Sequence, residues 1–382
     1  MTFHVDPKLL ATIHGSLKSI IDRSNKIPVA SMFHLAPGPD GGLVVTATDM
    51  DLETSITIDV AADFAPVCLP PYLVDTAGKL ATEKVEFLLD ERNAVIKAGR
   101  SRFTAPLLPG SDFPRLTPAF DASVEIPGEA LARIIEATDD AASTAADKDP
   151  RFYLEGVFLQ VYDGRLVATA TNGHRLHSAS TEAPQGAGLA EGIIVPTKAA
   201  KEIARIAGKA GGSKVRLHTC GSAVAIEAAG ERVTSKLIEA SYPDWRRVVP
   251  KATEVTATFD LAEMVAALDR VVKVMEASCT GKTAEKSASG TGVKLAEDGD
   301  WLTISAAGAH SAAEATDAVK AEFDGKWGMH GVSSRYLFAT LSNMRERGAE
   351  TVSIDSDEMA APLRIESITD EDFLAIVMPM RV

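Results

Sequence analysis

The sequence predicts an α+β protein in which one domain, built of two helices packed on antiparallel sheet, occurs three times along the chain. Two observations predict this fold: Asp-Gly hairpin turns recur at similar spacing, and matching strand–helix segments lie before and after each turn. At about 100–200 residues per domain, the 382 residues are enough for two to four such units. A hydrophobic content of 46% is sufficient for ordinary globular cores.

The Asp-Gly turns begin at Asp40, Asp163 and Asp298 and lie between strand-like runs. Asp-Gly is a strong hairpin signal because both central residues of a type I′ turn adopt positive φ. The intervals between the turns, roughly 120–135 residues each, indicate a repeated unit.

A strand followed by a helix precedes each turn. Residues 3–17, 124–138 and 257–271 each open with alternating apolar residues and continue with the periodicity of an amphipathic helix. After each turn, a second strand end leads into a helix near Leu69, Val195 and Val332. Helices on one face of antiparallel sheet are therefore expected in every unit. The predicted domains are 1–121, 122–251 and 252–382.

Composition narrows the class of protein. No apolar run approaches the roughly 18 residues of a membrane span, and no signal peptide is evident at the N-terminus. Three widely separated cysteines fit a reducing compartment, so we expect a cytoplasmic protein. The net charge of −14 argues against DNA binding through bulk positive charge, and any basic residues that meet DNA would have to share one face.

The stretch TNGHRL, residues 171–176, invites a catalytic or metal-binding interpretation. Asn172-Gly173 is first of all a hairpin turn, and His174 and His177 are three apart on the returning strand. Side chains at that spacing point to opposite faces, so they cannot chelate one ion. The chain has no Gly-x-Ser-x-Gly elbow, and CTGKTAEK lacks the first glycine of a phosphate-binding loop. A hydrolase or metalloenzyme using this region is kept as a remote alternative.

Basic residues gather on the helix expected after Val195. Lys198, Lys201 and Arg205 follow i, i+3, i+7 spacing and share one helix face. In a chain that is acidic overall, such segregation suits a surface lined with positive charge.

Five segments in order along the chain resemble those of the bacterial β sliding clamp family, the processivity factors of the replicative DNA polymerase. They are IPVASMFHL, RSRFTAPLLPGSDFPRL, TNGHRL, YPDWRRVVP and the terminal MPMRV. The resemblance implies three clamp-type domains and a head-to-tail homodimer that closes into a ring around double-stranded DNA, independent of sequence. It also implies DNA polymerase III α and other polymerases as partners, loading by an ATP-driven clamp loader, no cofactor and no enzymatic activity of the clamp itself.

The resemblance further implies a groove that binds partner motifs of the Gln-Leu-x-Leu-Phe type. Arg175 and Arg247 would bond peptide carbonyls at its rim, and the last five residues, Met378 to Val382, would form part of its surface. The groove residues carried over are Leu154, Thr171, Gly173, His174, Arg175, Leu176, Pro243, Arg247, Val248, Tyr336, Ile376, Met378, Pro379, Met380 and Arg381.

Two other surfaces follow from the same resemblance. The DNA-facing residues would be Arg23, Lys26, Lys148, Tyr153, Lys198, Lys201 and Arg205. At the dimer interface, Arg100, Arg102 and Phe103 of one subunit would face Lys273 and Val274 on the other subunit.

The chain departs from the usual family pattern at several positions. Asn172 stands where the family usually has aspartate, Pro362 occupies a position of the groove wall, and a longer loop is expected around residues 280–291. A specialised clamp copy, carried by a mobile element or conferring resistance to an inhibitor, is therefore an alternative to a housekeeping clamp.

Overall fold

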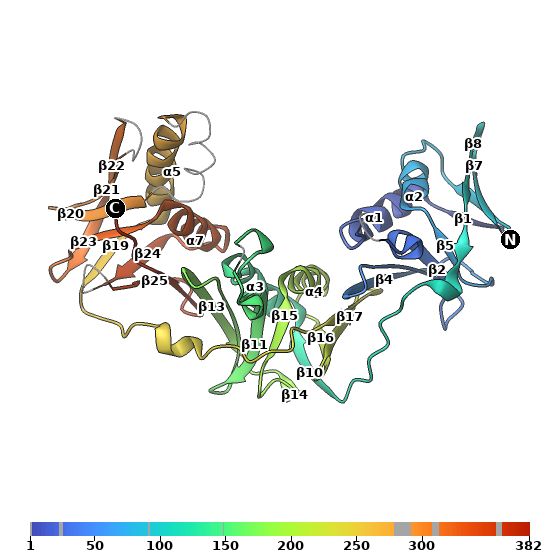
Figure 1. Cartoon of the computed structure of the whole chain (residues 1–382), viewed down its shortest axis with the longest axis horizontal. Coiled ribbons are helices and arrows are strands. Elements are labelled where there is room, and N and C mark those ends of the chain that lie inside the picture. Colours follow the sequence, from blue (N-terminus) through green and yellow to red (C-terminus); the bar gives the residue numbers. More distant parts are fainter. Residues whose placement is uncertain are drawn as a thin grey trace. The chain divides into compact units, whose positions relative to one another are not determined.

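The computed structural model describes residues 2–22, 26–90, 92–147, 149–278, 292–307, 313–356 and 361–382 (Figure 1). The predicted loop at 280–291 lies outside this part of the chain. The described residues form two compact units, each treated separately below. The first comprises Met1–Ala132, Pro184–Gly188 and Lys201–Glu239, and the second comprises Arg133–Ala183, Leu189–Ala200 and Ala240–Val382.

The same order of elements occurs three times: a strand, a helix, four strands, a second helix and three strands. The first copy contains β1 (Thr2–Val5), α1 (Pro7–Leu17), β2 (Phe33–Pro37), β3 (Leu43–Thr48), β4 (Leu52–Ile58), β5 (Val67–Leu69), α2 (Pro71–Gly78), β6 (Val85–Leu89), β7 (Asn93–Ala98) and β8 (Ser101–Pro106), with the short β9 (Leu108–Pro109) after it.

The second copy adds one short strand, β14, to this order. It contains β10 (Ala122–Pro127), α3 (Gly128–Glu136), β11 (Gly156–Tyr162), β12 (Arg165–Thr171), β13 (Arg175–Glu182), β14 (Gln185–Ala187), β15 (Ile193–Pro196), α4 (Thr197–Lys209), β16 (Lys214–Cys220), β17 (Ala223–Ala228) and β18 (Glu231–Lys236).

The third copy ends at the C-terminal strand. It contains β19 (Thr256–Asp260), α5 (Leu261–Ser278), β20 (Gly292–Asp298), β21 (Trp301–Ala307), β22 (Glu314–Asp324), β23 (Met329–Ser333), α7 (Ser334–Glu346), β24 (Thr351–Asp355), β25 (Leu363–Ser367) and β26 (Phe373–Val377).

Strand pairing repeats with the element order, which confirms the predicted α+β fold of three related domains. In each copy the first strand lies in one group with the last three and pairs with the first of them, as in β1-β6-β7-β8, and the four middle strands form a second group, as in β4-β3-β2-β5. Neighbouring copies then join edge to edge: β18 pairs with β4, and β13 pairs with β26. Each joined sheet lies within one compact unit, and the middle copy contributes strands to both joined sheets. The middle copy is therefore divided between the two units.

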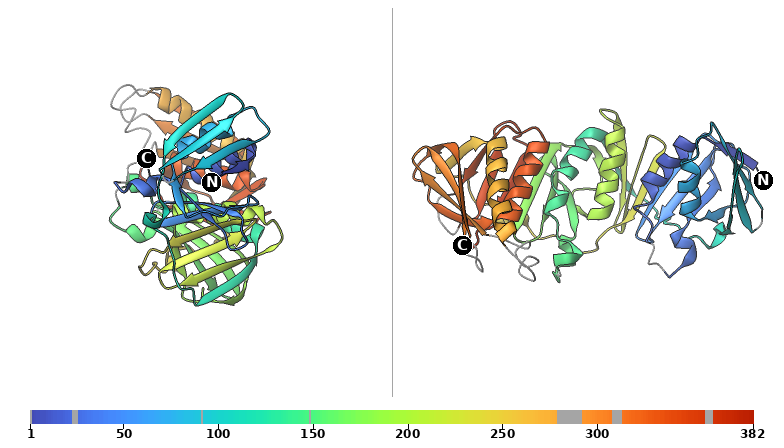
Figure 2. Two further views of the ribbon diagram at one scale, coloured as in Figure 1. Left: turned by 90° about the vertical axis from the view of Figure 1, so that its right-hand side faces the viewer. Right: turned by 90° about the horizontal axis from the view of Figure 1, so that it is seen from above.

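Helices cover the sheets within each unit, and of the three Asp-Gly turns only the middle one has the predicted geometry, since the φ angles of Asp40 and Asp298 are not positive. In the first unit α1 packs against α2, and in the second α5 packs on α7, β21 and β22 (Figure 2). At the middle hairpin, Asp163 and Gly164 have φ of 48° and 72°, as a type I′ turn requires. The predicted domain boundaries fall between elements, after β9 and before β19. None of the helices in the described ranges is long and apolar enough to span a membrane.

Helix α1 illustrates how local sequence fixes an element. Asp6 caps it by accepting a hydrogen bond from Lys8 N at 2.8 Å, and Pro7 occupies the first turn, where a missing N–H costs nothing. Leu10, Ile13 and Leu17 recur along one face and are buried.

Both connectors between domains are tied to a buried carboxylate. Arg115 donates two hydrogen bonds of 3.0 Å to Glu53 on β4. Thr253 donates from its N–H and hydroxyl to Asp355 at the end of β24, at 2.8 and 2.5 Å. Since Glu53 and Asp355 are 5% and 7% exposed, these bonds are partly shielded from water and anchor the connectors firmly.

His34 makes the stability of the first unit dependent on pH. Burial, with a smaller contribution from Arg115, lowers its pKa from 6.5 to about 4, and its ring stacks on Phe113 with centroids 4.8 Å apart. Between pH 6.5 and 4 the unfolded chain binds a proton at His34 that the folded chain excludes. The contribution of neutral His34 to the free energy of unfolding is therefore complete above this window and is lost as pH falls through it. We expect a loss of about 3 kcal/mol from this group.

Calorimetric melting at pH 7.5 and pH 5 tests this expectation. The His34→Leu variant should lose less of its melting temperature between the two pH values than the wild type does. An equal decrease in both proteins would show that His34 is not responsible.

Candidate functional site

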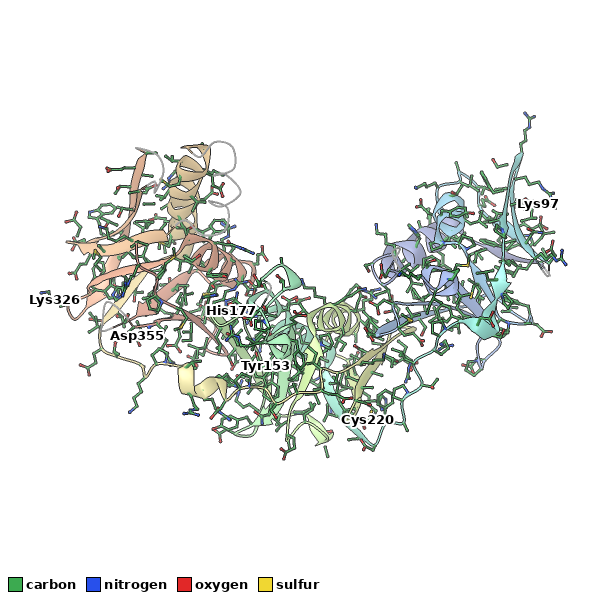
Figure 3. The ribbon with its side chains drawn as sticks, viewed as in Figure 1. Lys97, Tyr153, His177, Cys220, Lys326 and Asp355 are labelled. Atoms are coloured by element: carbon green, nitrogen blue, oxygen red, sulfur yellow. The ribbon has the colours of Figure 1, made fainter. Side chains whose placement is uncertain are left out.

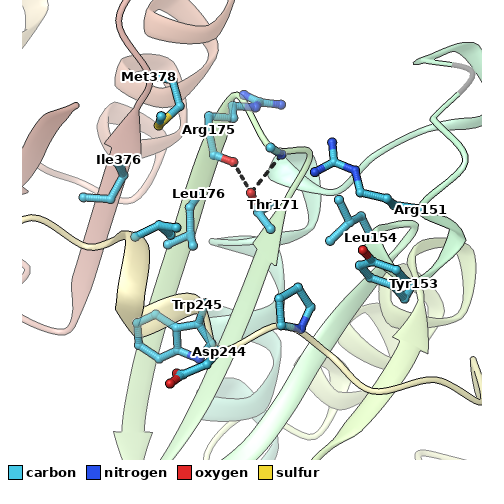
Figure 4. Close-up of a pocket in the computed structure, with 13 residues that line it drawn as sticks. Arg151, Tyr153, Leu154, Thr171, Arg175, Leu176, Asp244, Trp245, Ile376 and Met378 are labelled. Carbon is cyan, nitrogen blue, oxygen red and sulfur yellow. Dashed lines mark hydrogen bonds between the residues drawn. The ribbon is translucent and has the colours of Figure 1, made fainter. Parts of the chain in front are cut away.

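A cavity of about 260 Å³ opens in the second unit beside the hairpin of β12 and β13 (Figure 4). The hairpin, the turn before β11, the connector after β18 and the C-terminal strand β26 all contribute to it. Its lining residues are Arg151, Tyr153, Leu154, Thr171, Gly173, Arg175, Leu176, Pro243, Asp244, Trp245, Val248, Ile376 and Met378.

The tip of the hairpin is closed by its own side chains. The Thr171 hydroxyl donates to Arg175 O at 2.6 Å and accepts from Gly173 N at 3.0 Å (Figure 4). Asn172 Oδ1 accepts from His174 N at 2.9 Å and from Arg175 N at 3.1 Å. An uncharged amide oxygen therefore closes the turn.

The bottom of the cavity is apolar and the sides carry exposed apolar groups. Leu154, Leu176 and Ile376 are at most 2% exposed, so their side chains are fixed by the surrounding core. Val248 and Met378 are 53% and 38% exposed and can still bury surface against a ligand. A concave site with apolar walls and few polar groups is typical of a binding pocket for apolar side chains.

The C-terminal residues are held in place. Met378 N donates to His174 O at 2.9 Å, and Met380 N donates to Gly331 O at 2.7 Å. The Met380 carbonyl lies so close to Gly331 that a Cβ could not fit there. Met378 lines the cavity, whereas the Met380 methyl group lies over Gly292 on β20 and not in the cavity lining.

The Arg175 side chain is buried beside Asp140. Its guanidinium is 9% exposed, donates to Asp140 Oδ2 at 3.1 Å and to Asp140 O, and lies 5.5 Å from the centre of the Tyr336 ring. Asp140 takes up one donor from each terminal nitrogen of the guanidinium, and the expectation that Arg175 bonds peptide carbonyls stays a prediction. The Arg175 side chain is part of the cavity wall, where Asp140 holds it.

Asp140 also holds His177, which lies in the interior of the second unit (Figure 3). His177 Nδ1 is 3.0 Å from Asp140 Oδ1, and its Nε2 is 2.9 Å from the Thr340 hydroxyl on α7. Burial raises the pKa of Asp140, but His177 and Arg175 lower it by more, so the net pKa is below the usual range. The carboxylate therefore stays charged beside β13, and the His177 ring links β13 to α7.

Arg151, Asp244 and Trp245 line the cavity without having been predicted as groove residues. Tyr153, which was predicted to face DNA, also lines the cavity, because the 3-10 turn Phe152–Leu154 places it beside Leu154. Its contact with DNA stays a prediction. A second 3-10 turn, Trp245–Val248, brings Trp245 and Val248 to the same side. The i, i+3 spacing of these two residues was the available signal.

The remaining predicted groove residues surround the cavity without lining it. The His174 ring stacks on Tyr336, with centroids 5.8 Å apart and planes 12° apart. Arg247 is exposed in the turn after Trp245. Residues 379–381 follow the C-terminal path across β23, where Pro379 bridges to Val332. Their role as contacts of a ligand stays a prediction.

The predicted DNA-facing residues differ in their surroundings. Lys198 and Lys201 are exposed on α4, and Lys26 is exposed before the turn Pro28–Ser31. Arg205 forms ion pairs of 2.8 Å with Glu202 and with Glu231, which limits its availability for another partner. Arg23 and Lys148 lie outside the described residues.

The residues predicted for the dimer interface lie on exposed elements. Strand β8 is an edge of the four-stranded sheet; Arg102 is exposed on it and Phe103 is half-buried. Arg100 is exposed in the turn before β8. On α5, Lys273 pairs with Asp269 at 2.6 Å, and Val274 is 49% exposed.

The described residues offer no support for the metalloenzyme alternative. Among them, no group of three His, Cys, Asp or Glu side chains could hold a metal ion. His177 contacts Asp140 and Thr340, and His174 stacks on Tyr336, so each ring already has a packing partner.

Another cavity, of about 380 Å³, lies in the first unit between α1 and α2. Asp75 in the wall of this cavity is 3.4 Å from His14 and 2.6 Å from Lys79. The charge of the Asp75 carboxylate is therefore largely balanced by these two side chains. We assign no function to it.

Comparisons with known proteins cover the whole chain. Residues 1–117 match the N-terminal domain of the DNA polymerase III beta subunit, and residues 125–244 match its central domain. The beta sliding clamp of Caulobacter vibrioides is 31% identical over 397 residues, and that of Pseudomonas aeruginosa is 26% identical over 386 residues, each covering 100% of both chains.

Solved structures agree with the sequence matches. The DnaN sliding clamp of Bartonella birtlesii, determined with griselimycin bound, has a TM-score of 0.89 at 25% identity and covers 100% of both chains. Caulobacter crescentus pol III beta has a TM-score of 0.85 at 29% identity with the same coverage. Three related domains on joined sheets, with an apolar groove beside the last strand, define a DNA sliding clamp. The chain belongs to the family of the bacterial beta sliding clamp, the beta subunit of DNA polymerase III.

Proposed function

We propose that this chain forms a homodimeric ring around double-stranded DNA and tethers polymerases by binding a short apolar motif in the groove beside β13 and β26. The observation that carries the tethering function is the cavity itself, in which the buried Leu154, Leu176 and Ile376 underlie the exposed Val248 and Met378. The protein acts as a tether and not as an enzyme, and it needs no cofactor for this.

The groove chemistry suits a motif of the Gln-Leu-x-Leu-Phe type. A leucine or phenylalanine anchor gains about 1.5–3 kcal/mol when it is fully buried, so two anchors supply about 3–6 kcal/mol, a large share of the about 8 kcal/mol that corresponds to micromolar binding. Met378 adds an adaptable wall, because methionine repacks easily against different partners. This adaptability fits a site shared by DNA polymerase III α, other polymerases and the clamp loader.

Ring closure is proposed through the edge of β8 and helix α5. An unpaired edge strand offers its backbone to a second copy, and a head-to-tail contact between identical chains can close into a ring. In this arrangement Arg100, Arg102 and Phe103 face the exposed Lys273 and Val274 of the other subunit.

Titration of a fluorescent Gln-Leu-x-Leu-Phe peptide against the purified dimer tests the groove. The Val248→Asp variant should bind the peptide at least about tenfold more weakly, because a carboxylate replaces apolar surface that would be buried. Val248 is exposed, so the fold should be unaffected. Ile368→Asp, at a position that is 61% exposed and outside the cavity lining, is the matched control and should bind normally. Equal binding by both variants would contradict the proposal.

The basic face of α4 is proposed to meet the phosphate backbone. Replacing Lys198 and Lys201 by glutamate should reduce processive synthesis severalfold, while the stability changes by less than about 0.5 kcal/mol because both positions are exposed. Primer extension on a long template measures the effect. Glutamates at the exposed Lys294 and Lys320, on β20 and β22, introduce the same charge change and should leave processivity intact. Unchanged processivity in the α4 variant would mean that another face meets DNA.

A further inference from the structure

The connector between the second and third domains forms one wall of the groove without belonging to a sheet. Within residues 240–249, the hydrogen bonds between main-chain atoms run from Arg247 N to Asp244 O and from Val249 N to Arg246 O, so they stay inside one 3-10 turn and its flanks. Side-chain contacts therefore have a large share in setting where this wall stands. The wall residues are Pro243, Asp244, Trp245 and Val248.

Two side chains of β11 contact the connector, one before the wall residues and one within their turn. The Tyr242 ring stacks on Phe158, with centroids 4.7 Å apart and planes 2° apart. The Arg246 guanidinium lies 4.2 Å from the centre of the Tyr162 ring. Phe158 and Tyr162 are four residues apart on one strand, so they lie on the same face of the sheet. The connector is thus attached to a rigid strand at two points.

The Phe158 ring is also confined by Gly192. A Cβ at Gly192 would collide with the ring, so the glycine backbone lies close to it. Burial raises the pKa of the Tyr242 hydroxyl. The ring of Tyr242, which stacks on Phe158, is therefore the part of this side chain that fixes the connector.

We infer that Phe158 and Tyr162 are positioning residues of the groove: they hold the connector at the distance from the hairpin that apolar anchors of a partner require. Neither residue lines the cavity. The effect is one of preorganisation, because a wall that is free to move must be ordered when the ligand binds. This inference rests on the proposed peptide-binding function.

Peptide titration and hydrogen exchange, made on the same dimeric proteins, test the inference. In the Phe158→Leu/Tyr162→Leu variant we expect the peptide Kd to rise about fivefold to tenfold, the scale of ordering one or two side chains on binding. Amides of residues 240–249 should exchange faster, while those of β12 and β13 should be unchanged. Tyr242→Phe keeps the ring and should bind nearly as the wild type does. Gln160→Ala is the control. Gln160 lies on β11 between Phe158 and Tyr162, on the same face of the strand, and the change removes only its side-chain hydrogen bond to Ala190 O.

The outcomes separate this inference from the proposed function. No peptide binding by the wild type would overturn the proposed function and the inference with it. Normal wild-type binding with an unchanged Kd in the double variant would overturn the inference alone. A raised Kd without faster exchange in 240–249 would also overturn it, because the rings would then act by another route.

Discussion

Replacing Asp140 by alanine should destabilise the second unit by about 3 kcal/mol and weaken peptide binding, because the change leaves Arg175 buried without its carboxylate. His177 loses its partner at the same time. The expected loss is at the lower end for a buried ion pair, since the Asp140 side chain is 31% exposed. Urea unfolding of the two proteins measures the difference in the free energy of unfolding.

The pH dependence of this difference identifies its cause. The folded-state pKa of Asp140 is lowered, so its contribution is complete above the unfolded value of 3.8 and is lost as pH falls through the lowered value. The gap between wild type and Asp140→Ala should therefore be constant from pH 8 to pH 5 and shrink in stronger acid. Asp140→Asn keeps an oxygen acceptor and should lose less. A gap below about 0.5 kcal/mol at pH 7 would contradict the role assigned to Asp140.

Deleting Met378 to Val382 should weaken binding of a Gln-Leu-x-Leu-Phe peptide at least about tenfold, which corresponds to 1.4 kcal/mol. The deletion removes Met378 from the cavity wall and the hydrogen bond to His174 O. It also removes the bond from Met380 N to Gly331 O, so a small loss of stability is expected alongside.

A shorter truncation is the matched control for this deletion. Removing only Arg381 and Val382 keeps Met378, Met380 and both backbone hydrogen bonds, so it should weaken peptide binding much less than the five-residue deletion does. Equal affinity of the full chain and the five-residue deletion would show that the C-terminal residues are not part of the site.

Most of the fold was predictable because local signals recur three times. The Asp-Gly turn at Asp163 requires positive φ and has it, and the strand–helix segments are repeated with the same pairing of strands. The compact units were not predictable from these signals. They depend on edge-to-edge pairing of β18 with β4 and of β13 with β26, between segments far apart in the sequence.

The positions of site residues on regular strands were predictable from the sequence. The ion pairs of charged site residues were not, because their partners lie far away in the sequence. Leu176 and Ile376 pair across β13 and β26, so their strands carry both into the cavity. The ion pair of Arg175 was not predictable because its partner, Asp140, lies 35 residues earlier in a 3-10 turn. Arg205 likewise meets Glu231 from another element. A one-dimensional pattern of charges does not show which of them are neutralised in the fold.

The most direct measurement of the central claim compares retention of the clamp on circular and linear DNA. The protein is placed on a nicked circular plasmid by its clamp loader, separated from free protein by gel filtration, and followed before and after a single restriction cut. A closed ring should remain on the circle and leave through the ends once the plasmid is linear, with retention on the circle insensitive to moderate salt. Equal retention on circular and linear DNA, or release from the circle at the salt concentration that releases it from linear DNA, would contradict topological binding and with it the assignment of a sliding clamp.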